Sequence, residues 1–315
     1  MIFTTIRSPL YRASIFNALG AVTASPTISR YPARSASQLL RAMSSASSPT
    51  QKPLQSASAL DKPLYGDEVP ISEKEEIMSD VYCKVADRYD AVTDVISLWM
   101  NKPWKQRFVR QIQARPGDKM LDVAGGTCEV AKRYLQYQDT VNHDQTSSVH
   151  VVDFNKNMLL VGQRRLADSS WIRDGRITFA QGNAEDLCDV PDSSVDIYCI
   201  SAGMHNLPHP EKALSEAYRV LRPGGKFACL EYGHTEGMII GAVSCWYWDK
   251  AVPYLGQVLA NDRASYERLA RSVRTFPSQK QFAQAIRNAG FHLPGKGYEL
   301  YQWGMMVAYI GIKKV

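Results

Sequence analysis

The feature that most constrains the fold of this chain is a regular alternation of short apolar runs with helix-patterned segments. It extends from about residue 119 to about residue 232. Apolar runs such as "KMLDVAG", "VHVVDF", "RITFAQGN", "VDIYCIS" and "KFACLEYG" indicate strands. The segments between them, such as "NKNMLLVGQRRLA" and "PEKALSEAYRVL", have helical spacing, and "RPGG" after the second suits a helix end. The alternation predicts an α/β fold with a parallel sheet covered by helices on both faces.

The first sixty residues have a different composition from the rest of the chain. They contain no Asp or Glu, are rich in Ser and Ala, and carry six basic residues, namely Arg7, Arg12, Arg30, Arg34, Arg41 and Lys52. This composition is typical of a mitochondrial transit peptide, and the alternative is a tail without a targeting role. We expect a transit peptide at 1–48, a proline-containing linker at 49–70 and a folded domain at 71–315.

The charge and the cysteines exclude several classes of function. The net charge is +6, and the six basic residues of the N-terminal segment account for all of it. The remaining chain is close to neutral, so a nucleic-acid partner is not expected. The six cysteines form no C-x-x-C pair, which favours buried free thiols over disulfides or a metal site. The chain has no charge-free apolar run of about twenty residues, so we expect no transmembrane helix.

The residues at the predicted strand ends indicate an adenosine-like ligand, because ligands of parallel sheets bind at the carboxyl ends of the strands. The turn in "LDVAGGTCEV" follows a strand but lacks the G-x-G-x-x-G spacing of a pyrophosphate site. Asp153 ends the next strand and could accept hydrogen bonds from both ribose hydroxyls. Asn183, beside Ala184, could pair with an adenine edge. S-adenosylmethionine fits this pattern better than NAD, although a structural turn or a helix cap would look similar.

From about residue 81 to its end, the chain resembles the ubiquinone and menaquinone C-methyltransferases. The resemblance rests on "VADRYDAVTDVISLWMNKPWK", "LDVAGGT", "DFNKNML", "YRVLRPGGKFACLEY" and the C-terminal "NDRASYERLARSVRTFPS". It implies a class I S-adenosylmethionine-dependent methyltransferase, Rossmann-like, with a seven-stranded, mostly parallel sheet, and it makes 71–315 the methyltransferase domain. The cofactor contacts that it implies are Thr127, Asp153, Asn183, Ala184 and Ser201.

The resemblance also implies a substrate and a location. The substrate would be a polyprenyl benzoquinol such as 2-methoxy-6-polyprenyl-1,4-benzoquinol, methylated on a ring carbon. The enzyme would lie in the mitochondrial matrix, peripheral to the inner membrane, in a complex with other ubiquinone-biosynthesis enzymes. Two alternatives are a divergent enzyme acting on another phenol or a menaquinone precursor, and a cofactor-binding scaffold subunit of that complex.

The chain departs from the family pattern at several positions near the expected site. Cys128 and Glu129 stand where the family has Gly and Asp. Glu129 keeps the charge and could reach the cofactor's amino group, whereas Cys128 is tolerable only if the backbone there needs no positive φ. In "SAGMHNL", Ala202 replaces a Phe and His205 replaces an Arg.

Carbon methylation of a quinol requires a base, because the ring carbon becomes nucleophilic only when the adjacent hydroxyl loses its proton. Histidine changes its charge near neutral pH, so we expect His205 to be this base. Asn206 would hold the ring oxygen, and Tyr89 would assist. A positioning residue or a solvated bystander are the other interpretations of His205. The alternative bases, which could equally be helix caps or surface charges, are Asp90, Asp94 and Asp262.

The segment "MIIGAVSCWYWDKAVPYLGQVL" combines aromatic and aliphatic residues. We expect it to cover the polyprenyl tail and to touch the membrane, with four candidate tail contacts, Trp246, Tyr247, Trp248 and Tyr254. The alternative is a pair of core helices, or a homodimer contact, broken by Pro253.

Overall fold

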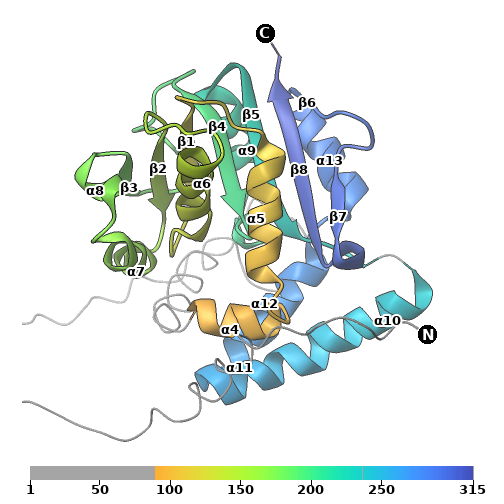
Figure 1. Ribbon diagram of the computed structural model, residues 1–315. Helices are drawn as coiled ribbons and strands as arrows, with labels where there is room; N and C mark the ends of the chain where they lie inside the picture. The colour runs from red at the N-terminus through yellow and green to blue at the C-terminus, as the bar shows by residue number, and fades with distance from the viewer. Residues whose placement is uncertain (1–88, 236, 315) are drawn as a thin grey trace, which may run out of the picture. The chain divides into compact units, whose positions relative to one another are not determined.

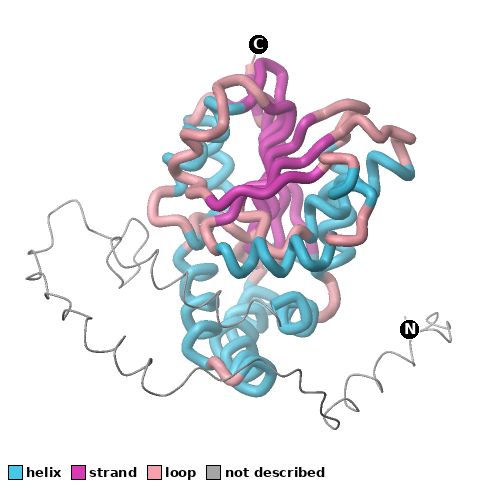
Figure 2. Tube along the Cα trace, turned by 90° about the vertical axis from the view of Figure 1, so that its left-hand side faces the viewer, coloured by secondary structure: helices cyan, strands magenta, loops and turns pink. Residues whose placement is uncertain are grey.

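The computed structural model describes residues 89–235 and 237–314. The predicted transit peptide, the linker and the start of the predicted domain lie outside these residues. Within them, a central β-sheet has helices on both faces, and a further group of helices lies at one end of the strands (Figures 1 and 2). The predicted α/β class is therefore confirmed.

The sheet contains eight strands in the order β3-β2-β1-β4-β5-β8-β6, with β7 paired to β8. Strands β1 to β5 are parallel to one another, and β8 is antiparallel to β5, β6 and β7. The three-residue β7 is the one strand of the described chain beyond the seven that we predicted. The bounds are β1 (Lys119–Val123), β2 (Ser148–Asp153), β3 (Ile177–Gln181), β4 (Val195–Ser201), β5 (Leu221–Tyr232), β6 (Phe291–His292), β7 (Glu299–Tyr301) and β8 (Met306–Lys313).

The helices cover the two faces of this sheet and form two apolar cores with it. One core contains the buried sides of α5 (Asn101–Ile112), α6 (Glu129–Thr140) and α7 (Lys156–Leu166), with α8 (Ser170–Arg173) at its edge. The other contains those of α9 (Pro210–Val220) and α13 (Gln279–Asn288). Strand residues alternate between the cores, as Cys199 and Ile200 do in β4. Burial on both faces explains why the strands are apolar throughout.

The glycines of "RPGG" do not end a helix as predicted. Helix α9 already ends at Val220, and Gly224, with φ 78°, lies within the span of β5. There the register between β4 and β5 shifts between Val195 and Ile197. The glycines therefore belong to an irregular part of β5, which the helical pattern of the sequence does not reveal.

A third group of helices lies at the carboxyl ends of the parallel strands, below the sheet in Figure 1. It comprises α4 (Tyr89–Ile96), α10 (Met238–Trp246), a π-helical turn η3 (Tyr247–Ala251), α11 (Val252–Ala260) and α12 (Arg263–Thr275). Val92, Trp248, Val252, Tyr266 and Val273 pack together as its core. This helical group packs against Tyr232, at the carboxyl end of β5.

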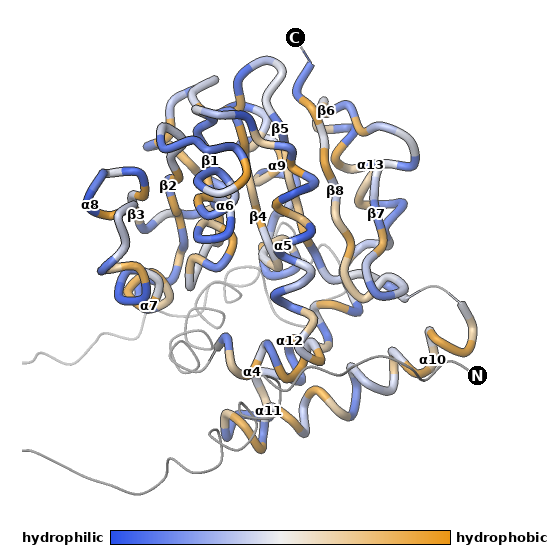
Figure 3. The backbone as a smooth tube through the Cα atoms, in the orientation of Figure 1, coloured by the Kyte–Doolittle hydropathy of each residue, from blue (hydrophilic) through white to orange (hydrophobic). Residues whose placement is uncertain are grey.

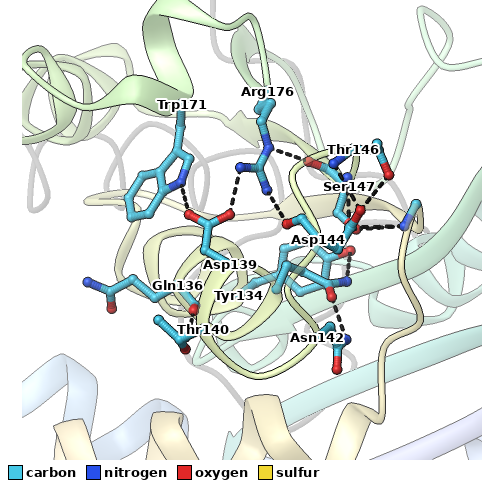
Figure 4. Close-up of polar contacts among 12 residues, drawn as sticks. Tyr134, Gln136, Asp139, Thr140, Asn142, Asp144, Thr146, Ser147, Trp171 and Arg176 are labelled. Atoms are coloured by element: carbon cyan, nitrogen blue, oxygen red, sulfur yellow. Dashed lines mark hydrogen bonds and ion pairs between the residues drawn. The ribbon is translucent and has the colours of Figure 1, made fainter.

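A polar network supports the opposite end of the sheet (Figure 4). Asp144 accepts hydrogen bonds from the Gly117 N–H at 3.0 Å and from the N–H groups of Thr146 and Ser147. Burial alone would raise the pKa of Asp144, but these bonds and those from the Ser147 and Thr146 hydroxyls outweigh it and hold the pKa below its ordinary value. The loop between α6 and β2 is therefore fixed by the Asp144 carboxylate.

We expect Asp144→Asn to lower the free energy of unfolding by about 1–3 kcal/mol, because an amide cannot accept all of these hydrogen bonds. A carboxylate with a lowered pKa stabilises the fold above its unfolded-state pKa of about 4 and loses that effect as the pH falls. The wild type should thus lose more stability than the variant on acidification from pH 5 to pH 3. Urea unfolding at both pH values measures this, with the exposed Asp168→Asn as control. Equal acid sensitivity of both proteins would contradict the assignment.

Candidate active site

A cleft opens at the carboxyl ends of β1, β2 and β4. All five predicted cofactor contacts line it, as does Asn206. This is also the switch point of the sheet, since the chain runs outward from β1 to β3 and then returns to β4 on the other side of β1. The lining residues are Lys105, Asp122, Ala124, Gly125, Gly126, Thr127, Glu129, Val130, Asp153, Phe154, Asn155, Met158, Gly182, Asn183, Ala184, Ser201, Ala202, Gly203, Asn206, Leu207 and Pro208.

The glycine turn after β1 forms one wall of the cleft. A Cβ on Gly125 would lie 2.6 Å from Val151 Cγ1 and 3.0 Å from the Asp122 carbonyl oxygen, so only glycine lets the turn lie this close to the strands. Gly126 has φ 47°, and Ala124 on the other side of Gly125 has φ 51°. The turn thus lines the cleft largely with backbone rather than side chains, which leaves space for a ligand.

Asp153 is fixed at the edge of the cleft by the backbone. Its Oδ2 accepts a hydrogen bond from the Gly126 N–H and its Oδ1 from the Asn155 N–H, both at 2.8 Å. Burial raises the pKa of Asp153 to about 6, against the effect of these two bonds. Each carboxylate oxygen retains a second lone pair for a ligand hydroxyl. The geometry suits the predicted ribose contact, with Asn183 and Ala184 lining the same cleft.

The expectation for Cys128 is wrong. Its backbone is left-handed, with φ 63° and ψ 26°, although it carries a Cβ. The thiol is fully buried, and a Cβ built on Gly162 of α7 would lie only 2.3 Å from its Sγ. Cys128 is therefore accommodated because α7 has a glycine opposite it, a compensation that lies 34 residues along the chain.

We expect Gly162→Ala to destabilise the protein by about 1–3 kcal/mol through overpacking against Cys128. The same substitution in a Cys128→Gly background should cost less, although a contact of 3.0 Å with the Gly126 carbonyl oxygen remains. Thermal or urea unfolding of the four proteins measures the coupling. An equal cost in both backgrounds would show that the thiol is not what Gly162 accommodates.

The three alternative bases each hold a structural contact. Asp90 accepts a hydrogen bond from the Thr127 hydroxyl at 2.9 Å and forms an ion pair with Arg165. Asp94 pairs with Lys102 at 2.7 Å. Asp262 caps α12 by accepting from the Ser265 N–H at 3.0 Å, as the helix-cap alternative supposes. Tyr89 begins α4, and its side chain lies outside the described part of the structure.

His205 lies in the short 3-10 helix η2 (Met204–Asn206), and it is not solvated. Its side chain is 2% exposed, and its Nδ1 lies 2.7 Å from Oε1 of Glu231, which is fully buried. A carboxylate can only accept, so Nδ1 carries the proton of the neutral ring and Nε2 is left as an acceptor. Nε2 has no hydrogen-bond partner among the described residues. Unlike Asn206, His205 is not part of the cleft lining, and its ring packs edge-on against Tyr232.

Glu231 was not among the predicted site residues. The sequence nevertheless indicates that Glu231 has a specific role. It lies within the apolar run "KFACLEYG", and an acid in a buried strand needs a hydrogen-bonding or charged partner. It also accepts a hydrogen bond from the Tyr232 N–H at 2.8 Å, which fixes the carboxylate.

Two buried polar atoms in the cleft lining, Ser201 Oγ and Asp122 Oδ1, lack a hydrogen-bond partner among the described residues. Such atoms normally have one, so a polar ligand in the cleft would complete the site. Together with the glycine wall and the Asp153 carboxylate, they fit the adenosine and amino acid parts of S-adenosylmethionine.

The aromatic residues of the predicted tail segment point in different directions. Trp248 is buried, and the Tyr247 hydroxyl donates to the Ile96 carbonyl oxygen at 2.7 Å, whereas Trp246 and Tyr254 are more than 60% exposed. Helix α10 buries none of its residues, so it is not a core helix. Pro253 lies in the first turn of α11, directly after the π-helical turn, where a missing N–H is tolerated.

The strand order, the glycine turn and the cleft define a class I methyltransferase fold. Two solved structures share it, an S-adenosylmethionine-dependent methyltransferase of Thermotoga maritima and the [4+2]-cyclase SpnF. The first has a TM-score of 0.50 and 18% identity, and covers 75% of this chain and 99% of its own. The second has a TM-score of 0.54 and 13% identity, and covers 77% and 96%. Likeness at this level shows the fold alone.

The chain belongs to the ubiE/COQ5 methyltransferase family, whose model matches residues 71–313. It is 40% identical over 252 residues to a Schizosaccharomyces pombe protein, the mitochondrial 2-methoxy-6-polyprenyl-1,4-benzoquinol methylase. That match covers 78% of this chain and 82% of the relative. The predicted family and the predicted methyltransferase activity are therefore confirmed.

Proposed function

We propose that this chain transfers a methyl group from S-adenosyl-L-methionine to a ring carbon of 2-methoxy-6-polyprenyl-1,4-benzoquinol in ubiquinone biosynthesis. The observation that carries the proposal is the 40% identity, over 78% of the chain, to the yeast enzyme of that name. The cleft supports it, because the residues expected to hold the cofactor all line one continuous surface.

The residues around the cleft have the following roles in this proposal. The bound cofactor supplies an electrophilic methyl group. Asp153 holds the ribose hydroxyls, and Asn183 with the Ala184 backbone holds the adenine. His205 Nε2 accepts the proton of the substrate hydroxyl next to the reacting carbon, while the Glu231 carboxylate fixes the ring and stabilises its protonated form. The Asn206 side chain positions the ring oxygen.

The full chain, supplied with methyl-labelled cofactor and a short-tailed methoxybenzoquinol, tests the proposal. Label on a ring carbon is the expected result, and the position is read by NMR. Transfer only to another phenol or to a menaquinone precursor would favour the divergent-enzyme alternative. Cofactor binding without any transfer would favour the scaffold alternative.

The proposed location is the mitochondrial matrix, peripheral to the inner membrane, in a complex with other ubiquinone-biosynthesis enzymes. The acid-free N-terminal sequence supports mitochondrial targeting, and the yeast relative is a mitochondrial protein. Helices α10 and α11 contain many hydrophobic residues (Figure 3). They support a membrane contact through exposed side chains, namely those of Met238, Ile239, Val243, Trp246, Tyr254 and Val258.

No helix within the described residues has the length and hydropathy needed to cross a bilayer. The apolar side of α10 and α11 could also form the contact of a homodimer. Sedimentation with cardiolipin-containing vesicles, set beside the oligomeric state in solution, separates the two interpretations. Binding to vesicles by a monomer would support the membrane contact, whereas a stable dimer that ignores vesicles would support the homodimer.

A further inference from the structure

Lys105 is the cation of the cleft. It projects from α5 and is the one basic residue among the described residues that line the cleft. Its ammonium makes no hydrogen bond or ion pair with any described residue. Three other basic residues of the described chain are paired, Lys102 with Asp94, Arg133 with Glu129, and Arg165 with Asp90.

The position of Lys105 corresponds to one end of the expected ligand. Asp153 and Asn183 assign the adenosine end to the side of β2 and β3. Helix α5 instead packs against β5, β8 and α6, on the other side of the glycine turn. The amino acid end of the cofactor has to extend towards that side, where Lys105, Asp122 and Glu129 line the cleft.

The acidic residues of the cleft would repel the carboxylate of a ligand unless a cation binds it. Its three acids are Asp122, Glu129 and Asp153, and Glu129 already has Arg133 and Arg165 as partners. The amino acid end of the cofactor carries one carboxylate and one ammonium group. The acids suit the ammonium, and Lys105 is the one cationic side chain of the described lining that suits the carboxylate.

We propose that the Lys105 ammonium binds the α-carboxylate of the S-adenosylmethionine amino acid moiety, and so selects this cofactor over nucleosides that lack a carboxylate. The inference rests on the proposed function. Burial lowers the pKa of Lys105, and the carboxylates of Glu129, Asp90 and Asp122 oppose that effect. A bound carboxylate would add to the charges that keep the amine protonated.

Two ligands that differ in one group test the proposal by isothermal titration calorimetry of the full chain. S-adenosylhomocysteine has the carboxylate, and its decarboxylated form, the 3-aminopropyl thioether of adenosine, lacks only that group. Lys105→Met should weaken S-adenosylhomocysteine binding by roughly 10- to 100-fold, the range of a charged hydrogen bond, and leave the decarboxylated ligand within about 2-fold. Lys105→Arg should restore most of the lost affinity.

Lys102→Met is the matched control, because Lys102 lies on the same helix but is exposed and paired with Asp94. It should bind both ligands as the wild type does, and thermal unfolding checks that each variant is folded. Equal losses for both ligands in Lys105→Met, or no loss for either, would overturn the assignment while leaving the proposed function intact. A wild type that binds neither ligand would instead overturn the proposed function itself.

Discussion

Replacing His205 with alanine is expected to lower kcat for methyl transfer by roughly 100- to 10,000-fold, the usual contribution of a positioned base. The reason is the buried pair that His205 forms with Glu231. The Glu231 carboxylate accepts a hydrogen bond from Nδ1, which lies 2.7 Å from Oε1. The other ring nitrogen, Nε2, has no hydrogen-bond partner among the described residues. Cofactor affinity should change little, because His205 does not line the cleft.

The Glu231→Gln variant tests whether His205 acts as a base or only packs against its neighbours. A glutamine can donate its amide N–H to Nδ1, which moves the ring proton to Nε2 and removes the acceptor. We expect kcat to fall by roughly 100-fold or more while the fold is kept, in line with the loss seen when the wrong histidine tautomer is imposed in other enzymes.

His209→Ala is the control for both variants, because His209 follows on the same loop but is partly exposed and pairs with Glu211. It should retain kcat within a few-fold. If His205→Ala turns over as the wild type does, with the same product, His205 is not the base.

Asp153→Asn is expected to weaken cofactor binding by roughly 100-fold. The substitution removes the charge that two ribose hydroxyls would share, and it places an amide opposite the N–H groups of Gly126 and Asn155. Because burial raises the pKa of Asp153 to about 6, the carboxylate of the free protein becomes protonated below that pH. Wild-type affinity should therefore fall as the pH drops from 7.5 to 5.

Calorimetric titration with S-adenosylhomocysteine across this pH range measures both effects. The Asp153→Asn variant should bind S-adenosylhomocysteine weakly, and its affinity should depend little on pH. Asp189→Asn, on an exposed turn, should behave as the wild type. A variant that binds tightly and keeps the acid dependence would show that another group holds the ribose.

The sequence determined the positions that follow from local pattern. The alternation of apolar runs and helices specified a parallel sheet, and a parallel sheet places its carboxyl ends along one edge. Thr127, Asp153, Asn183, Ala184 and Ser201 each follow or end a strand, so their arrival at one cleft needed no knowledge of packing. The family resemblance rested on the same motifs.

The tertiary structure alone decided which side chains meet. Glu231 faces His205 because β5 lies beside β4, and Lys105 reaches the cleft because α5, which precedes the sheet in sequence, covers β5 and β8. The Cys128 thiol has space to be buried because α7 has Gly162 opposite it. The spacing of apolar residues in the sequence indicates which residues are buried and where helices and strands end, because it arises from the local geometry of helix and strand. Pairing between elements depends on the order in which they pack, and no local pattern carries that information.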